Sequence, residues 1–316
     1  MSSTTVSSAT IKAIPTFARH ETFHPRYGWL KKGFDEASYD REIFLREDAS
    51  IRLGVGKNMV RSIRYWCHAF QLLEPPKEGK SKARLSQPTE FGNNLLADRG
   101  WDPFLEDPAS LWWLHWKLLQ FRDRATAWYF AFHVFRQVNF SPDDLLGELD
   151  EYQKTVFKKQ TAISSLKKDI SCLIRMYSPT FIDSGVLEDS INSPFSEIGL
   201  LDTGTSSKTY SFRVGEKETL PAEIVVAACL EFASYRGTQK TIALSSLAYE
   251  AGSPGLAFKL PETAIGDSIE QVSRYFDKIG ISDTAGLVQF YFQADNPFDL
   301  AKEILQTYYS RHGQTA

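Results

Sequence analysis

The first feature that could carry chemistry is the run His-Glu-Thr-Phe-His at residues 20–24, which has the HExxH spacing of zinc peptidases. Zinc chemistry of that kind needs both histidines on one face of a stable helix, with a third ligand downstream. Here Pro25 directly follows the second histidine and Gly28 weakens any continuing helix, which argues against a peptidase. Two interpretations stay open: a structural cluster with neighbouring aromatic residues, or a phosphate or metal site beside Arg26.

A second group of residues gathers three carboxylates: Asp102, Glu106 and Asp107. Carboxylates in such a group can hold Mg²⁺ or Mn²⁺ for phosphodiester cleavage. The competing interpretation, which the spacing favours, is that Asp107 caps a helix beginning at Pro108 and Asp102 caps a short turn. The metal ligands therefore stay unassigned. The candidate catalytic residues from the two groups are His20, Glu21, Asp102 and Glu106.

The third feature, residues 46–96, is typical of a helix-turn-helix followed by a basic wing. One helical face is apolar at positions 59, 60, 63, 66, 67 and 70, and the opposite face carries Lys57, Arg61, Arg64 and His68. The preceding Gly54-Val-Gly56 lacks the spacing of a Walker A loop, so we expect it to form the tight turn between two helices. A helix with one packed face and one cationic face is how proteins present a recognition helix to DNA.

A basic loop follows this helix. Pro75-Pro76 is expected to stop the helix, and Lys77–Arg84 would form the tip of the wing. Residues 52–84 hold eight Lys or Arg and two Glu, so this segment is +6 whereas the whole chain is −3. A basic segment in an acidic chain indicates a localised cationic surface rather than an overall excess of basic residues. The candidate DNA contacts are Arg26, Lys32, Lys57, Asn58, Arg61, Arg64, Lys77, Lys80, Lys82 and Arg84.

The helices and strands that must position these residues indicate a mainly α (α+β) fold, and the length of the chain indicates more than one domain. We expect a disordered polar tail at 1–13, a winged-helix DNA-binding domain at 14–107, a helical domain with a linker at 108–204, and a C-terminal winged-helix-like domain at 205–316. In the middle part, helices are predicted over 111–119, 125–135 and 154–177, the last as one helix or as two with a break near Thr161, and another begins at Ser141-Pro142.

The C-terminal part repeats the order helix, short helix, turn, helix and strand. The sequence predicts a strand at 210–214, helices at 222–235, 245–250 and 261–279, and a strand at 287–292. The longer helix carries mostly acidic residues, which should repel phosphates. We therefore expect this part to make a protein contact or a homodimer surface rather than to contact DNA.

The composition excludes several classes of protein. The three cysteines are far apart and form no CxxC pair, which argues against a disulfide framework and a structural zinc site. Neither a transmembrane run nor a signal peptide is evident, so we expect a cytoplasmic protein. Because the sequence has no Walker A loop, we expect no nucleotide cofactor.

Several longer segments resemble the SspB family of the Ssp DNA phosphorothioation and phage-defence system. They are residues 17–33 with FARHETFHPRYGWLKKG, 53–66 with LGVGKNMV and IRYW, 102–116 with DPFLEDPASLWWLHW, and shorter pieces at 168–177, 188–194 and 247–255. His24 departs from this resemblance. The resemblance covers nearly the whole chain after the tail.

The resemblance implies a DNA-binding component that nicks DNA to allow sulfur insertion, alongside a cysteine desulfurase and a sulfurtransferase. It leaves open whether the chain is itself an enzyme, a metal-dependent nicking endonuclease using Mg²⁺ or Mn²⁺. The alternatives are a non-catalytic DNA-binding adaptor that recruits the sulfur-transfer enzymes, and a transcriptional regulator, which would need a symmetric dimer and a palindromic site.

Overall fold

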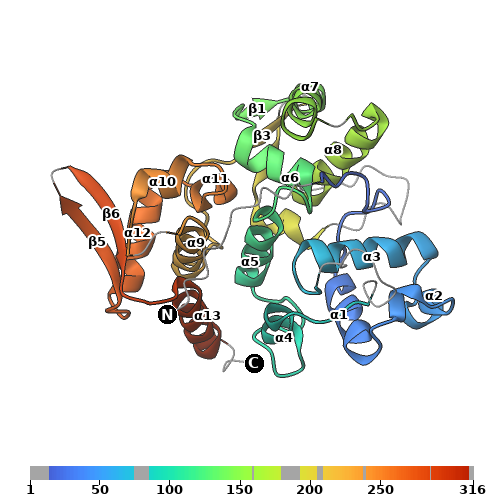
Figure 1. The fold of residues 1–316 in the computed structure, drawn as a ribbon, viewed down its shortest axis with the longest axis horizontal. Helices are drawn as coiled ribbons and strands as arrows, with labels where there is room; N and C mark the ends of the chain where they lie inside the picture. The colour runs from blue at the N-terminus through green and yellow to red at the C-terminus, as the bar shows by residue number, and fades with distance from the viewer. Residues whose placement is uncertain are drawn as a thin grey trace, which may run out of the picture.

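The computed structural model describes residues 14–74, 85–158, 160–178, 193–204, 209–237, 240–284 and 286–312 (Figure 1). The described chain is mainly helical, with two small antiparallel sheets of three strands each. This confirms the predicted α+β class with a helical majority. The predicted tail at 1–13 and the loop Lys77–Arg84, with the candidate DNA contacts Lys77, Lys80, Lys82 and Arg84, lie outside the described residues.

The N-terminal part consists of α1 (Trp29–Tyr39), the 3-10 turn η1 (Ile43–Leu45), α2 (Ala49–Leu53), α3 (Lys57–Ala69) and α4 (Glu90–Leu96). Gly54 links α2 to α3 with a left-handed backbone (φ 63°), which confirms the expected tight turn. An isolated antiparallel bridge between Leu73 and Pro88 brings together the chain on either side of the undescribed loop.

Helix α3 buries the apolar face that its sequence periodicity predicts. Val60, Ile63, Trp66 and Cys67 are all buried, against α1 among other elements. The helix ends at Ala69, several residues before the proline pair expected to stop it. Its end is set instead by Gln71, whose backbone is left-handed (φ 61°) and cannot continue an α-helix.

The middle part is built around α5 (Pro108–Leu119), which is buried along almost its whole length. Asp107 caps α5 by accepting a hydrogen bond from Ala109 N, with Pro108 in the first turn, as the sequence predicted. The middle part also contains α6 (Thr126–Tyr129), which packs against α5, the π-helical turns η3 (Phe130–Val134) and η4 (Gln153–Phe157), α7 (Pro142–Tyr152) and α8 (Ile163–Tyr177). Of the two alternatives for residues 154–177, the structure shows the one with a break near Thr161, because η4 ends at Phe157 and α8 begins at Ile163.

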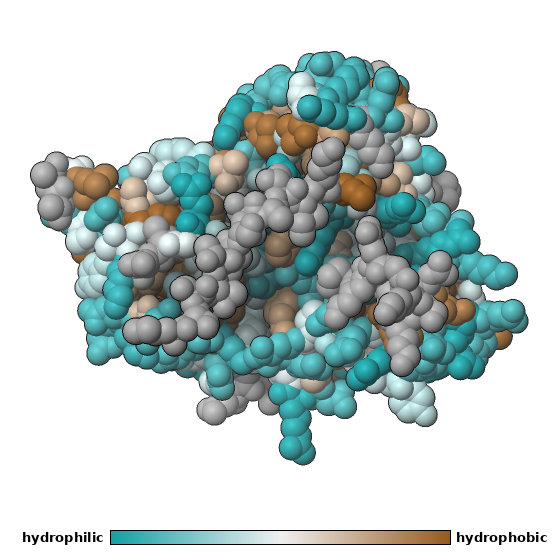
Figure 2. Space-filling model, in the orientation of Figure 1, coloured by the Kyte–Doolittle hydropathy of each residue, from teal (hydrophilic) through white to brown (hydrophobic). Residues whose placement is uncertain are grey.

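The first sheet joins parts of the chain that the sequence analysis had separated. Its order is β1-β3-β2, with β1 at Asn139–Phe140, β2 at Leu201–Thr203 and β3 at Tyr210–Phe212; β2 follows the 3-10 turn η5 (Pro194–Ile198). Strand β3, which we expected to open the C-terminal part, pairs with β1 and β2 instead. Figure 2 shows apolar atoms gathered over β1 and β3 on this face of the molecule.

The C-terminal part begins with the buried helix α9 (Ala222–Tyr235). It continues through β4 (Thr241–Ala243), α10 (Leu244–Tyr249), α11 (Pro254–Phe258), α12 (Glu262–Ser273), β5 (Ile279–Thr284), β6 (Leu287–Phe292) and α13 (Pro297–His312). The strands form a sheet of order β4-β6-β5, which projects at the left of Figure 1. The helix predicted over 261–279 ends at Ser273, because residues 274–278 form turns and strand β5 starts at Ile279.

The buried side chains form one continuous core that runs from α1 to α13. In that core a buried ion pair joins α5 to α9: Lys117 Nζ lies 2.5 Å from Glu231 Oε1, and Trp116 Nε1 donates to Glu231 Oε2 at 2.8 Å. A charge pair buried this deeply must keep its partners, because one left alone would be strongly destabilising. The N-terminal and C-terminal parts are thus packed on a shared central layer.

Candidate nucleic-acid interface

The HExxH segment does not form a helix. Residues 18–22 make consecutive turns, and Ala18, Glu21 and Thr22 have left-handed backbones with φ of 52°, 49° and 69°. A β-branched residue such as Thr22 rarely adopts this conformation. Because the two histidines of the motif do not share a helix face, the geometry of a zinc peptidase is absent from this loop.

His20 points into the protein, where it meets a carboxylate from α8. Its Nε2 lies 2.6 Å from Asp169 Oδ1, the same oxygen that accepts a hydrogen bond from Ala18 N at 2.9 Å. His20 is fully buried and its ring stacks on Trp66, with the centroids 6.1 Å apart. Burial raises the pKa of Asp169, while the contact with His20 acts in the opposite direction. The ring therefore anchors the loop from inside and does not reach the surface.

The loop also rests on α3. Trp66 Nε1 donates to Phe23 O at 3.0 Å, and Ser62 Oγ donates to the same oxygen at 3.4 Å. These bonds leave Glu21 at the surface, with its Oε1 3.7 Å from the Arg61 guanidinium. In Figure 1 the dark blue loop lies between α3 and α8. A half-buried carboxylate thus stands beside the exposed face of the proposed recognition helix.

The outward face of α3 carries the polar residues that the sequence assigned to DNA contact. Lys57, Asn58 and Arg61 are exposed, and Arg64 is half-buried. In the described part of the chain, Lys57 has no carboxylate within ion-pair distance. Figure 2 shows hydrophilic atoms over much of the right-hand side, where α1, α2 and α3 lie.

Two further candidates flank this helix in different ways. Arg26 lies over two aromatic rings, with its guanidinium carbon 5.5 Å from the Phe23 centroid and 5.4 Å from that of Trp29. Stacking of this kind fixes a planar guanidinium while leaving its edge free to bind an anion. Lys32 Nζ donates to Leu53 O at 3.0 Å, at the end of α2, and so stands beside the turn that leads into α3.

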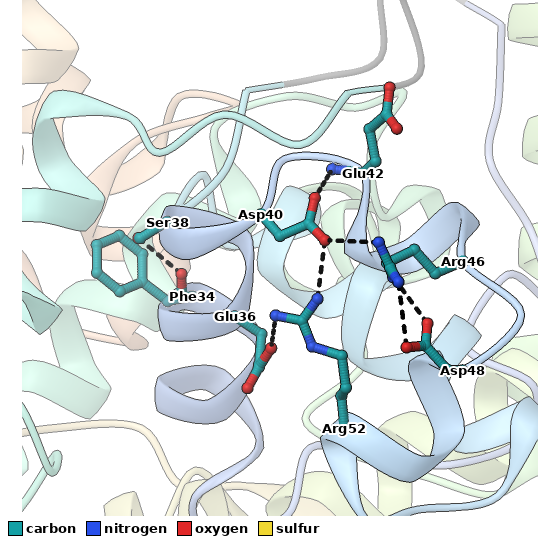
Figure 3. A network of polar contacts seen from close by, with 8 residues as sticks. All are labelled: Phe34, Glu36, Ser38, Asp40, Glu42, Arg46, Asp48 and Arg52. Atoms are coloured by element: carbon teal, nitrogen blue, oxygen red, sulfur yellow. Dashed lines mark hydrogen bonds and ion pairs between the residues drawn. The ribbon is translucent and has the colours of Figure 1, made fainter.

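Not every basic residue of segment 52–84 adds to this face. Arg52 is held by two carboxylates of α1 and its C-terminal cap, Glu36 at 2.6 Å and Asp40 at 2.8 Å (Figure 3). Arg46, which precedes that segment, forms a similar pair with Asp48 at 2.7 Å. The count of +6 for the segment therefore overstates the charge available to a polyanion, since Arg52 is already neutralised.

His68 also differs from its expected place on the cationic face. It is half-buried, and burial lowers its pKa to about 4, with the charge of Arg64 acting in the same direction. The ring is therefore neutral near pH 7. The cationic face of α3 ends at Arg64.

The two carboxylate candidates near residue 102, Asp102 and Glu106, have different surroundings. Asp102 Oδ1 accepts from Glu106 N at 3.0 Å, and its Oδ2 accepts from Asp107 N at 3.0 Å and from Ser110 Oγ at 2.6 Å. The Asp102 side chain is buried, whereas that of Glu106 is exposed. These contacts match the capping interpretation and leave no open face on Asp102 for a metal ion.

A magnesium site made of protein ligands alone does not form in the part of the chain that the structure describes. No three His, Cys, Asp or Glu side chains come together there as metal ligands. Mg²⁺, however, often binds through one or two carboxylates and takes its remaining ligands from water and phosphates. Glu21 is a partly exposed carboxylate whose Oε1 lies 3.7 Å from the Arg61 guanidinium, so a phosphate would have to balance the charges of Arg61 and of any cation bound there.

The corresponding helix of the C-terminal part presents a different surface. Asp267 and Glu270 are exposed on α12 together with Gln271 and Arg274. Lys278, which follows the helix in the sequence, pairs with Glu303 of α13 at 2.9 Å. The exposed face of α12 is therefore acidic, as the sequence predicted.

A family model and two crystal structures match most of this chain. A family model described as "Protein of unknown function (DUF4007)" matches residues 17–309. The structure is similar to a magnesium ion-bound SspB crystal structure, with 37% identity, a TM-score of 0.87, and coverage of 93% of this chain and 88% of that one. A second SspB crystal structure matches with 36% identity, a TM-score of 0.86, and coverage of 96% and 91%. No curated protein matches this chain.

The chain therefore belongs to the DUF4007 family and to the SspB family of proteins. The resemblance noted in the sequence is confirmed. None of the described helices has the length and apolar character needed to cross a membrane.

Sequence reasoning missed two residues that shape the loop, Asp169 and Arg175. Arg175 donates from its guanidinium to Thr22 O at 2.8 Å, so α8 holds the loop at two points. A signal for Asp169 was present: it falls at the same helical spacing as the buried Leu166, Ile170 and Leu173. A carboxylate on an apolar face indicates a buried partner, but that partner lies 149 residues earlier in the chain.

Proposed function

We propose that this protein binds double-stranded DNA through the exposed face of α3 and nicks the duplex within the Ssp DNA phosphorothioation system. Membership of the SspB family supports the role in that system. The α3 face supports the choice of ligand, because exposed cations on a helix next to a tight turn suit a phosphate backbone. The partners we propose are duplex DNA and the cysteine desulfurase and sulfurtransferase of the same system.

A winged helix is the structural form that we propose for the N-terminal part. Helices α2 and α3 are joined by the Gly54 turn, and the bridge between Leu73 and Pro88 would form the base of a hairpin. Glu74 N donates to Gln87 O at 2.7 Å beside that bridge. The basic residues of 77–84 lie outside the described residues, and this proposal assigns them to phosphate contact. The order of elements from α9 to β6 supports the same proposal for the C-terminal part.

The observation that carries the nicking proposal is the contact between Glu21 and Arg61. It places a carboxylate at the cationic face, where a DNA phosphate would bind. A related SspB was crystallised with magnesium, and Mg²⁺ or Mn²⁺ held by Glu21 would neutralise charge that develops on the phosphate. Arg61 would bind a neighbouring phosphate oxygen, and Arg26 would clamp the strand by a second guanidinium contact.

A plasmid assay tests this proposal. Purified protein incubated with supercoiled DNA should convert it to the open-circular form in Mg²⁺ or Mn²⁺, and EDTA should abolish that conversion while duplex affinity changes by no more than about twofold. The affinity should persist because cation–phosphate contacts need no metal. Conversion that continues unchanged in EDTA would contradict a metal-dependent nickase.

A second candidate function is a DNA-binding adaptor that recruits the sulfur-transfer enzymes without cutting DNA. The observation in its favour is that no group of three metal-ligating side chains forms among the described residues. The two functions separate in the same assay. An adaptor would bind the duplex with salt-sensitive affinity and leave the plasmid supercoiled with every divalent cation.

A further inference from the structure

The loop 18–22 stores backbone strain beside the proposed site. Three of its five residues, Ala18, Glu21 and Thr22, are non-glycine residues with left-handed backbones. Such conformations persist only where the surroundings hold them, and they concentrate at functional sites. The strain here includes Glu21 itself, the residue that we propose to face the phosphate.

Contacts from two elements hold this loop in place. From α8, Asp169 accepts from Ala18 N and from His20, and Arg175 donates to Thr22 O. From α3, two side chains donate to Phe23 O. The residues bonded in this way surround Glu21 on both sides in the sequence, so its backbone has little freedom to relax.

We infer that Asp169 is a positioning residue that, through His20 and the Ala18 amide, holds Glu21 beside Arg61 at the DNA-facing surface. The inference rests on the proposed function, because it assigns the loop's geometry to nicking. Asp169 and His20 are both buried and touch no surface, so neither is a catalytic residue in this account.

The physical argument is that one carboxylate satisfies two donors that would otherwise be buried without partners. Without Asp169, the His20 ring and the Ala18 N–H would both lose their acceptor. Buried polar groups in that state are costly, so the loop would rearrange toward water and relax its left-handed residues. The backbone of α8 would stay in place, since Leu166, Ile170 and Leu173 fix it in the core.

The test begins with the conformation of the loop in the full chain. We expect Asp169→Ala to retain the far-ultraviolet circular dichroism of the wild type and to speed hydrogen exchange at Ala18 and Phe23. Arg175→Ala provides a second variant in case Asp169→Ala folds poorly, because it removes a half-buried side chain that holds the loop by a single hydrogen bond to Thr22 O. Lys167→Ala, an exposed basic residue on the same helix, is the matched control and should leave the exchange unchanged.

Activity then distinguishes positioning from general destabilisation. Both Asp169→Ala and Arg175→Ala should lower the nicking rate, by about a hundredfold for the former, while KM for plasmid changes little, as a small misplacement of a reacting group can cost that much. The double variant Asp169→Ala, Glu21→Gln should lose no more than the larger single loss, because both changes remove the same group from the site.

Each result has a distinct consequence. Faster exchange with lost nicking and a non-additive double variant supports the inference. Unchanged exchange, or faster exchange with wild-type nicking, overturns it and leaves the proposed function standing. If wild-type protein never nicks with any divalent cation, the nicking proposal fails, and the inference that Asp169 serves nicking fails with it, even where exchange shows that the loop is held.

Discussion

Helices α3 and α12 occupy comparable positions in two parts of the chain, yet their outward faces carry opposite charge. Each follows a shorter helix and precedes antiparallel pairing, the Leu73–Pro88 bridge in one case and the β5–β6 hairpin in the other. Helix α3 exposes Lys57 and Arg61, whereas α12 exposes Asp267 and Glu270. The same order of elements can therefore serve different partners, and the side chains on the outward face decide which.

The comparison also concerns what lies next to each helix. Beside α3, a strained loop brings a carboxylate to the cationic surface. Beside α12, Lys278 is paired with Glu303, and the exposed cation at the end of the helix is its C-cap residue, Arg274. The first arrangement suits a phosphate and a divalent cation, and the second suits a basic protein surface. Four predictions, the first with a matched control variant, test this contrast from the largest expected effect to the smallest.

The largest effect is expected from Glu21→Gln. The change keeps the side chain's size but removes the charge that would hold a divalent cation, so the nicking rate should fall by at least about a hundredfold. Duplex affinity should change by less than about threefold, because Glu21 is not a phosphate ligand. The measurement is plasmid nicking in Mg²⁺ alongside fluorescence anisotropy with a labelled duplex.

Asp102→Asn is the matched carboxylate variant for that experiment. Asp102 accepts three hydrogen bonds near the start of α5, so its substitution should lower the free energy of unfolding by about 1–3 kcal/mol. Nicking by the folded fraction should stay close to wild type. The assignment of the two carboxylates would be reversed by an Asp102→Asn protein that is fully stable and inactive.

Arg61→Ala combined with Arg64→Ala should weaken duplex binding by about ten- to a hundredfold at moderate salt. Each phosphate contact that is lost should reduce the slope of log affinity against log salt by about 0.9. The salt series is best run with Lys167→Ala as a control for loss of a basic residue elsewhere. An affinity and a slope both equal to wild type would remove α3 from the interface.

The acidic face offers the reciprocal change, Asp267→Ala with Glu270→Ala. Because this face is not expected to contact DNA, duplex affinity should stay within about twofold of wild type and its salt slope should not change. The same anisotropy titration measures both. A gain of tenfold or more would mean that α12 lies close to the phosphates.

The smallest effect on DNA binding is expected from His68→Gln. Since burial lowers the pKa of His68 to about 4, the residue carries no charge between pH 7.5 and pH 6, and the salt slope should match wild type over that range. Its effect should appear in stability instead. The unfolded chain binds a proton at His68 below about pH 6.5 and the folded chain does not, so stability falls as the pH drops from about 6.5 toward 4.

For His68 alone this loss is about 1 kcal/mol between pH 6.5 and pH 5.5. Urea unfolding at the two pH values should therefore show a smaller pH dependence in His68→Gln than in wild type. An equal pH dependence in the two proteins would show that His68 binds a proton as readily in the folded state as in the unfolded chain.

Much of the fold follows from local patterns in the sequence. The apolar spacing of α3, the cap of α5 at Asp107 and the run that forms α9 are each dictated by neighbouring residues, and the structure places them as expected. The sequence analysis did not predict several elements, among them α1, β5 and α13. Helix α13 has a regular apolar face, with Leu300, Ala301, Ile304 and Leu305 buried, and the same rule would have found it.

The site was harder to predict because its geometry depends on contacts between distant segments. The HExxH spacing drew attention to the loop, but only Asp169 explains why His20 is buried while Glu21 stays half-buried at the surface. The pairing of Arg52 with Glu36 and Asp40 likewise depends on how α1 packs beside α2. Charge counted along the sequence cannot show which cations are neutralised by residues that meet them only in the fold.

The most direct test of the central claim is site-specific photo-crosslinking to duplex DNA from the two helices. Asn58 on α3 and Gln271 on α12 are both exposed amides, and the three native cysteines are buried free thiols. A cysteine-reactive photo-crosslinker can therefore be attached selectively to Asn58→Cys or Gln271→Cys in the full chain. We predict strong crosslinking from position 58 that high salt suppresses, and background crosslinking from position 271. Equal crosslinking from the two positions, or a stronger signal from 271, would contradict the assignment of DNA to the α3 face.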